Sequence, residues 1–145
     1  MHRLAIHIAA LLIAPVASSA MFAGSAAAQS LGPFMVFFDD GSTDLTPQGR
    51  AILDNVASAY RASGDGQQVM IAGHTDRAKE GAPGVAESQA RASAVRAYLV
   101  SQGLSDGVIT VEAFGSTRPL VETDAGVLEP QNRRVEITVG PGSGW

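Results

Sequence analysis

The sequence predicts a single domain of the α+β class, with its strands and helices in the order β-α-β-α-β-β. Two segments carry apolar residues at helical spacing, and they separate short apolar or alternating segments that are typical of strands. Stretches rich in glycine, serine and aspartate lie between these segments. The chain of 145 residues is 46% hydrophobic, which is enough for the core of one domain of ordinary size.

The first strand is predicted at residues 34–38, where an unbroken apolar run lies between turn-forming residues. A run of this length favours a strand that is buried on both faces. The first helix is predicted to begin with Thr46 as its N-cap and Pro47 in its first turn, and to end at residues 63–66. Its apolar positions at helical spacing are Ile52, Leu53, Val56 and Tyr60.

The second strand is predicted at residues 69–75, and Gly73-His74-Thr75-Asp76 stands at its C-terminal end. Such strand ends commonly face binding sites. A turn at residues 79–84 leads into the second helix, which Gly103 ends. The apolar stripe of this helix consists of Ala92, Val95, Tyr98 and Leu99. Arg91 is expected to lie off the centre of that stripe.

The last two strands are predicted at residues 108–114 and 134–139, where apolar and polar residues alternate. In the final strand the valines and isoleucine would point inward, and Arg134, Glu136 and Thr138 outward. A long polar connection, residues 116–131, separates the two strands. The sequence shows no internal repeat.

Residues 1–28 are predicted to be a secretory signal peptide, because Arg3 precedes an apolar stretch that small residues follow. Cleavage is expected after Ala28, with Ala20 as an alternative position. Retention of the segment as an N-terminal anchor is the competing expectation, although its apolar stretch falls short of the ~20 residues of a membrane span. The remaining parts are a linker at residues 29–33, the domain at residues 34–140 and a flexible tail at residues 141–145.

The composition excludes several classes of partner. The chain contains no cysteine, so this sequence offers neither a disulfide bond nor a cysteine for lipid attachment. Its formal net charge is −4, and removal of Arg3 with the signal peptide would make it more acidic. An acidic domain lacks the positive surface that a nucleic acid backbone requires. We therefore expect no nucleic acid partner. Separately, we expect no cofactor and no metal site.

Asp76 and Arg91 are the strongest candidates for a ligand site. A carboxylate and a guanidinium on neighbouring loop and helix ends can bind a ligand that carries both an ammonium and a carboxylate. We expect both side chains to be exposed and directed at the ligand. The simpler interpretations are that Asp76 caps a turn or helix and that Arg91 is a solvated cation on a helix surface.

Several short motifs, in this order, resemble the peptidoglycan-binding domain shared by OmpA, Pal lipoproteins and MotB-type proteins. They are Phe37-Phe38-Asp39 with Ser42 and Leu45, Gly73-His74-Thr75-Asp76, Ser88 with Arg91-Ala92, Gly115, Pro119, and Asn132-Arg133-Arg134-Val135-Glu136. The resemblance covers roughly residues 34–140. It implies a two-layer sandwich, with two helices on one face of a mixed four-stranded sheet whose strand order is 1-4-2-3.

The resemblance also implies a ligand, the stem peptide of peptidoglycan with its diaminopimelate residue. Asp76 would bind the ammonium of that residue and Arg91 its carboxylate. Arg133 would lie beside the peptide, and the other expected ligand-binding residues are Thr75, Asp39, Ser42 and Asn132. Arg134 is expected to be structural. A protein of this kind would act in the periplasm, associated with the wall or outer membrane, alone or through an envelope protein partner.

The sequence departs from the family pattern at three positions near the expected site. Lys79 stands where the family has glycine, Gly84 where it has asparagine, and Glu87 where it has leucine. These departures keep a second function open, an interaction module that retains the fold, binds a protein partner and has lost the wall ligand.

Catalysis is not expected. His74 and Asp76 alternate along the chain, so they could form an acid–base pair or, with Asp39, ligate a metal. However, the sequence has no nucleophile elbow, phosphate-binding loop or zinc-protease motif. A histidine that braces the loop is the simpler interpretation.

Overall fold

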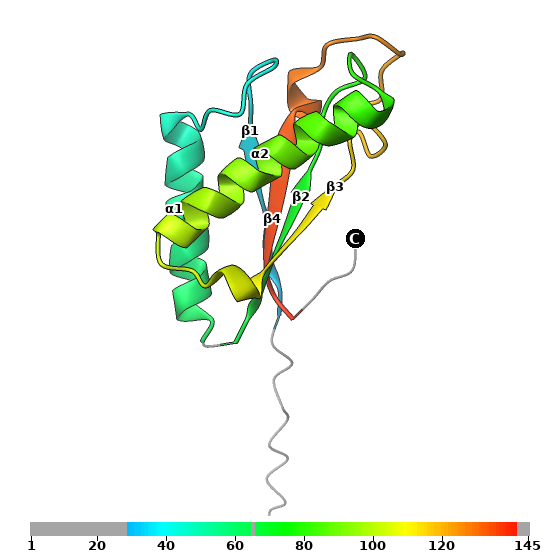
Figure 1. The fold of residues 1–145 in the computed structure, drawn as a ribbon. Helices are drawn as coiled ribbons and strands as arrows, with labels where there is room; N and C mark the ends of the chain where they lie inside the picture. Colours follow the sequence, from blue (N-terminus) through cyan, green and yellow to red (C-terminus); the bar gives the residue numbers. More distant parts are fainter. Residues whose placement is uncertain (1–28, 65, 142–145) are drawn as a thin grey trace, which may run out of the picture.

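The structure is a computed structural model that describes residues 29–64 and 66–141. Two helices cover one face of a four-stranded sheet (Figure 1), and the strand order is β1-β4-β2-β3. Both the two-layer architecture and the strand order agree with the prediction. The predicted signal peptide and residues 142–145 of the predicted tail lie outside the described residues.

The sheet is mixed, and its pairing brings one end of β2 next to the start of β4. The strands are β1 (Leu31–Phe37), β2 (Gln68–Gly73), β3 (Ile109–Ala113) and β4 (Arg134–Gly140). Strand β4 runs antiparallel to both β1 and β2, whereas β3 runs parallel to β2. Gly73 is consequently paired with Val135. The loop after β2 and the loop before β4 therefore meet at one end of the molecule.

Strand β1 lies at an edge of the sheet, and the prediction that it is buried on both faces was wrong. Val36 is completely buried in the core, whereas Phe37 is 43% exposed. The helices cover only one face, so side chains that alternate with Val36 point to the open side. The strand also begins at Leu31, within the segment predicted to be a linker.

Helix α1 (Pro47–Ala62) begins where the sequence predicted. The Oγ1 of Thr46 accepts a hydrogen bond of 3.0 Å from the backbone N–H of Gly49. This bond satisfies one of the backbone N–H groups that have no partner within the helix. Leu53 and Val56 are completely buried, and the helix packs mainly against β1.

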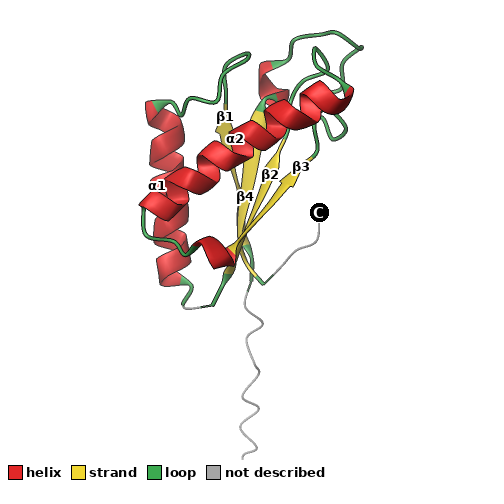
Figure 2. Ribbon diagram, viewed as in Figure 1, coloured by secondary structure: helices red, strands yellow, loops and turns green. Residues whose placement is uncertain are grey.

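Helix α2 (Gly81–Ser101) packs against β3 and β2 (Figure 2), with Ala92, Val95 and Leu99 in the core. It begins within the turn predicted at residues 79–84, and Glu80 does not cap it with its side chain. Short 3₁₀ helices, η1 (Asp106–Val108) and η2 (Pro130–Asn132), precede β3 and β4. Within the described part of the chain, no helix has the length and apolarity to cross a membrane.

Candidate functional site

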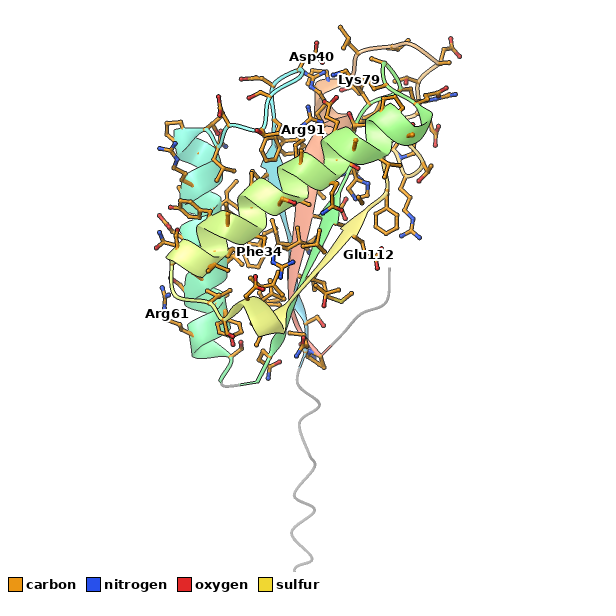
Figure 3. All side chains as sticks on the ribbon, in the orientation of Figure 1. Phe34, Asp40, Arg61, Lys79, Arg91 and Glu112 are labelled. Carbon is orange, nitrogen blue, oxygen red and sulfur yellow. The ribbon has the colours of Figure 1, made fainter. Side chains whose placement is uncertain are left out.

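The candidate site lies where four segments meet at the C-terminal end of β2. The segments are the β1–α1 loop, the residues that follow β2, the first half of α2, and the residues that precede β4. Figure 3 shows Arg91 on α2, below Lys79 and Asp40, at the end of the domain where these loops gather. The structure brings six of the seven predicted site residues into one cluster: Asp39, Ser42, Thr75, Asp76, Arg91 and Arg133.

Arg91 is the most heavily coordinated side chain of the cluster. Its Nε donates to the carbonyl of Ser42 at 3.1 Å, and its Nη2 donates to the carbonyl of Asp39 at 3.1 Å. Its Nη1 donates to Thr75 Oγ1 at 3.2 Å. The guanidinium also lies over the ring of Phe38, 5.7 Å from its centroid. Arg91 thus ties α2 to the β1–α1 loop and to the end of β2.

The prediction that Arg91 is exposed was wrong, because its side chain is completely buried. A helical projection places Arg91 beside the apolar stripe, but the β1–α1 loop covers that flank of α2. Burial lowers the pKa of Arg91 below its ordinary value, and the carboxylate of Glu87 acts in the opposite direction. Because an arginine titrates far above neutral pH, the guanidinium remains charged.

Glu87 supplies the counter-ion of Arg91, and the sequence-based prediction did not include it in the site. Its Oε1 forms an ion pair with Arg91 Nη2, one helical turn further along α2. Its Oε2 lies 2.6 Å from the Nζ of Lys79. The hydrogen bond to Glu87 raises the pKa of Lys79. The four-residue spacing of Glu87 and Arg91 is the sequence signal that predicts such a pair.

Asp76 is also buried, with 2% of its surface exposed, so its predicted exposure was wrong. Its Oδ2 accepts hydrogen bonds from Arg133 Nη1 at 2.8 Å and from the backbone N–H of Glu129 at 3.0 Å. Its Oδ1 accepts one longer bond, 3.3 Å, from the N–H of Ala78. The carboxylate therefore holds the connection between β3 and β4 against the loop after β2 by hydrogen bonds. This is a structural role.

Asp39, Ser42 and Thr75 reach Arg91 in different ways. Asp39 and Ser42 contact it through backbone carbonyls, whereas Thr75 uses its hydroxyl. The hydroxyl of Ser42 instead accepts a bond of 3.0 Å from the N–H of Asp44. The contribution of this loop to the cluster thus depends on its backbone path more than on its side chains.

The predicted site residue Asn132 does not join the cluster. Its Oδ1 accepts bonds from the N–H groups of Leu120 and Val121, each at 2.8 Å, and its Nδ2 donates to the carbonyl of Val121 at 2.7 Å. The side chain is completely buried. Asn132 therefore organises the long connection between β3 and β4, in place of contacting Asp76 or Arg91.

A groove of about 500 Å³ opens beside the cluster, and Asp39 and Arg133 contribute to its wall. The other lining residues are Phe37, Phe38, Thr46, Gln48, Pro130 and Gln131. Arg133 connects the groove to the cluster, because its Nη1 bonds to Asp76 while its Nε donates to the carbonyl of Phe38 at 3.2 Å. A ligand in this groove would meet Arg133 before it reached Asp76.

His74 lies apart from this cluster, toward the open face of the sheet. Its ring stacks on Phe114 with centroids 5.4 Å apart, and its Nε2 is 4.0 Å from Glu136 Oε1. Burial, with the nearby positive charge of Arg134, lowers the pKa of His74 to about 4. Among residues 29–64 and 66–141, no group of three or more histidine and carboxylate side chains is placed to hold a metal ion.

Arg134 also faces the open side of the sheet. Its Nε bonds to Glu136 Oε1 at 2.8 Å, and its Nη2 donates to the carbonyl of Arg118 at 3.2 Å. These contacts attach the segment after β3 to β4.

Comparison with known proteins finds relatives over most of the chain. The sequence model of the OmpA family matches residues 37–133. The chain is 37% identical over 103 residues to outer membrane protein A of Bordetella avium, which covers 71% of this chain and 53% of that protein. It is 36% identical over 101 residues to the peptidoglycan-associated lipoprotein of Pseudomonas aeruginosa, which covers 70% of this chain and 59% of that protein.

A solved structure has the same fold. The crystal structure of the peptidoglycan-associated lipoprotein from Burkholderia pseudomallei superposes with a TM-score of 0.66 at 27% identity, over 72% of this chain and 88% of that one. The chain spans little more than half of the length of the two relatives that were compared by sequence, 53% and 59%.

Proposed function

Because the chain belongs to the OmpA family, we propose that it binds the stem peptides of peptidoglycan, without catalysis, and so contributes to the integrity of the cell envelope. Two of the relatives described above are named for their association with peptidoglycan, one matched by sequence and one by structure. Relatives that are named as outer membrane proteins and lipoproteins support a location in the envelope, and we propose the periplasm.

The proposed recognition uses Asp76 for the ammonium of diaminopimelate and Arg91 for its carboxylate. The observation that carries it is the convergence of these two charges, since Thr75, next to Asp76 in the chain, accepts a hydrogen bond from Arg91 at 3.2 Å. Arg133 and Asp39 extend the site into the groove, where the rest of the stem peptide would lie. Each charge-assisted hydrogen bond contributes about 1.5–3 kcal/mol.

Binding of a single stem peptide is expected to be weak. Both charges already have internal partners, Arg133 for Asp76 and Glu87 for Arg91. A ligand gains only the difference between its own contacts and those that it displaces, less the cost of association. Firm attachment then depends on many sites engaging one polymer.

Co-sedimentation of the purified protein with isolated diaminopimelate-type peptidoglycan tests the proposal. The informative variant is Asp76→Asn, which keeps the shape of the side chain and removes the charge that would bind the ammonium. Asp40→Asn is the matched control, because Asp40 is exposed in the neighbouring loop. Wild type and the control should pellet with the wall, and Asp76→Asn should remain in the supernatant.

The second candidate function is a protein-interaction module of the same fold. The internal pairing of Asp76 and Arg91 favours it, because a site whose charges are already satisfied needs no wall ligand. If wild type fails to pellet with peptidoglycan, this function replaces wall binding. If Asp76→Asn pellets as well as wild type does, the wall is bound through other residues.

A further inference from the structure

We propose that Lys79 is a positioning residue for ligand binding: it keeps Glu87 in an ion pair when the carboxylate of the ligand replaces Glu87 on Arg91. This inference rests on the proposed function, because it describes how the same site admits its ligand. It is carried by the two ion pairs of Glu87 and by the different exposure of the three side chains.

Arg91 cannot be reached by a ligand unless one of its present partners moves. Its side chain is completely buried, and its guanidinium contacts two backbone carbonyls, the hydroxyl of Thr75 and the carboxylate of Glu87. Among these four partners, the carboxylate is the one that carries a negative charge and stands on a flexible stem. Its place is therefore the one that the carboxylate of a ligand can take.

Glu87 lies between two cations. Its Oε1 pairs with Arg91, and its Oε2, which is buried from solvent, lies 2.6 Å from the Nζ of Lys79. Two positive charges therefore share one carboxylate. A carboxylate from the ligand would make the numbers equal, with the ligand on Arg91 and Glu87 on Lys79. This exchange leaves a counter-ion beside each of the four charges.

Lys79 has the freedom to follow Glu87 as it moves away from Arg91. Its side chain is 44% exposed, and its ammonium carries several N–H donors on a flexible stem. Asp40, at the same end of the domain (Figure 3), also acts on Lys79 electrostatically, but Asp40 is exposed and water solvates its carboxylate. Lys79 is thus available to Glu87.

Without Lys79, the cluster would have no other cation free to receive the displaced carboxylate of Glu87. Arg133 already bonds to Asp76 and to the carbonyl of Phe38. Only 11% of the Glu87 side chain is exposed, so water would compensate its charge poorly. Because a buried charge without a partner is unfavourable, Glu87 would then stay on Arg91 and oppose the ligand.

The first test compares wild type with Lys79→Gln by calorimetric titration of the full chain with a soluble disaccharide–peptide fragment of diaminopimelate-type peptidoglycan. Lys79→Gln should bind the fragment about fivefold more weakly, as expected for the loss of one partly exposed ion pair. Arg61→Gln is the matched control, because it removes one positive charge at an exposed position of α1 (Figure 3), and it should bind as wild type does. Unchanged binding by Lys79→Gln would overturn the inference.

The second test repeats this substitution in a chain that also carries Glu87→Gln. Glutamine keeps the shape of the side chain and an acceptor oxygen for Arg91, but it removes the negative charge that Lys79 is proposed to receive. Glu87→Gln alone should bind the fragment at least as tightly as wild type, and the addition of Lys79→Gln should have no further effect. If the addition weakened binding as it does in wild type, Lys79 would contact the ligand itself and the inference would be wrong.

Lys79→Arg keeps the inference open to contradiction even if Glu87→Gln does not fold. Arginine supplies a cation to Glu87, so this variant should bind the fragment nearly as well as wild type. Binding as weak as that of Lys79→Gln would overturn the inference. Thermal denaturation should give wild type and both variants similar unfolding temperatures, and a large decrease in Lys79→Gln would assign the weaker binding to lost stability instead.

The same titrations separate this inference from the proposed function. Failure of wild type to bind the fragment would overturn both. Equal binding by wild type and Lys79→Gln would overturn the role of Lys79 and leave binding of the stem peptide intact.

Discussion

Arg91 joins three segments of the chain that are distant in sequence. It holds the carbonyls of Asp39 and Ser42 on one side and the hydroxyl of Thr75 on the other. These bonds join segments that are distant in sequence, so Arg91 contributes to folding as well as to any ligand contact. A loss of binding on its replacement is therefore informative only if stability is measured with it.

Arg91→Ala is expected to lower the free energy of unfolding by about 3 kcal/mol, since it breaks a buried ion pair and leaves part of Glu87 unpaired. This outcome differs from the sequence-based expectation that Arg91→Ala leaves the fold intact, and burial is the reason. Urea denaturation measures the change. Arg61→Ala, at an exposed position near the end of α1, should alter stability by no more than about 0.5 kcal/mol. If the free energy of unfolding fell by the same small amount in both variants, Arg91 would have no structural role.

His74 is expected to make stability depend on pH in the acidic range. Its pKa of about 4 in the folded protein lies below the ordinary 6.5, so the unfolded chain takes up the proton first as pH falls. The contribution of neutral His74 to the free energy of unfolding is fully present above pH 6.5. It is lost as the pH falls towards 4, by up to about 1.4 kcal/mol per pH unit. Urea denaturation at pH 7 and pH 5 measures how much the free energy of unfolding falls between the two pH values. This decrease should be smaller for His74→Gln than for wild type. An unchanged loss would assign the pH dependence to the carboxylates.

Two close approaches at the level of elements fix the start of α2 against the end of β2. A Cβ at Gly73 would lie 2.2 Å from the carbonyl oxygen of Ser88, and one at Gly84 would lie 2.1 Å from that of Lys79. Ser88, in turn, accepts a hydrogen bond from the N–H of Gly115 at 3.0 Å. This packing fixes the position of α2 along β2, and therefore where Glu87 and Arg91 meet the loop after β2.

Gly84→Asn, which restores the residue typical of the family, should destabilise this chain and not improve its binding. The new Cβ would collide with the backbone at Lys79, and overpacking of this kind costs about 1–3 kcal/mol. Ala86→Asn is the control, because it places the same residue at an exposed position of α2. There the only cost to stability is the lower helix propensity of asparagine, about 0.7 kcal/mol. Thermal denaturation of the two variants should rank Gly84→Asn as the less stable. The reverse order would show that the turn at residues 79–84 rearranges freely.

Local signals predicted the elements, but contacts between distant segments decided the site. The cap formed by Thr46 and Pro47 and the strand formed by residues 134–140 depend on neighbouring residues, so local sequence patterns predict them directly. The exposure of Phe37 depends on β1 being an edge strand, and the burial of Arg91 depends on a loop that begins about fifty residues earlier. Asn132 matched a site position but turned toward Leu120 and Val121, which no local pattern predicts.

At the scale of the whole molecule, the charges that form the site are concentrated at one end and shielded from solvent. Asp76, Arg91 and Arg133 are buried there, and their ion pairs balance the charges within the cluster. The chain as a whole carries a formal net charge of −4. Long-range attraction would thus contribute little to binding of a polymer whose stem peptides carry carboxylates of their own.

Binding to peptidoglycan should therefore fall only moderately when salt is raised from about 0.1 M to 1 M, where the screening length shortens from about 10 Å to about 3 Å. Contacts within a partly desolvated cluster are screened far less than charges on the surface. Co-sedimentation across this range measures the effect, with Asp76→Asn as the background at each concentration. Complete release of wild type at modest salt would indicate loose adsorption through exposed side chains such as Lys79, and the cluster would then not be the site of attachment.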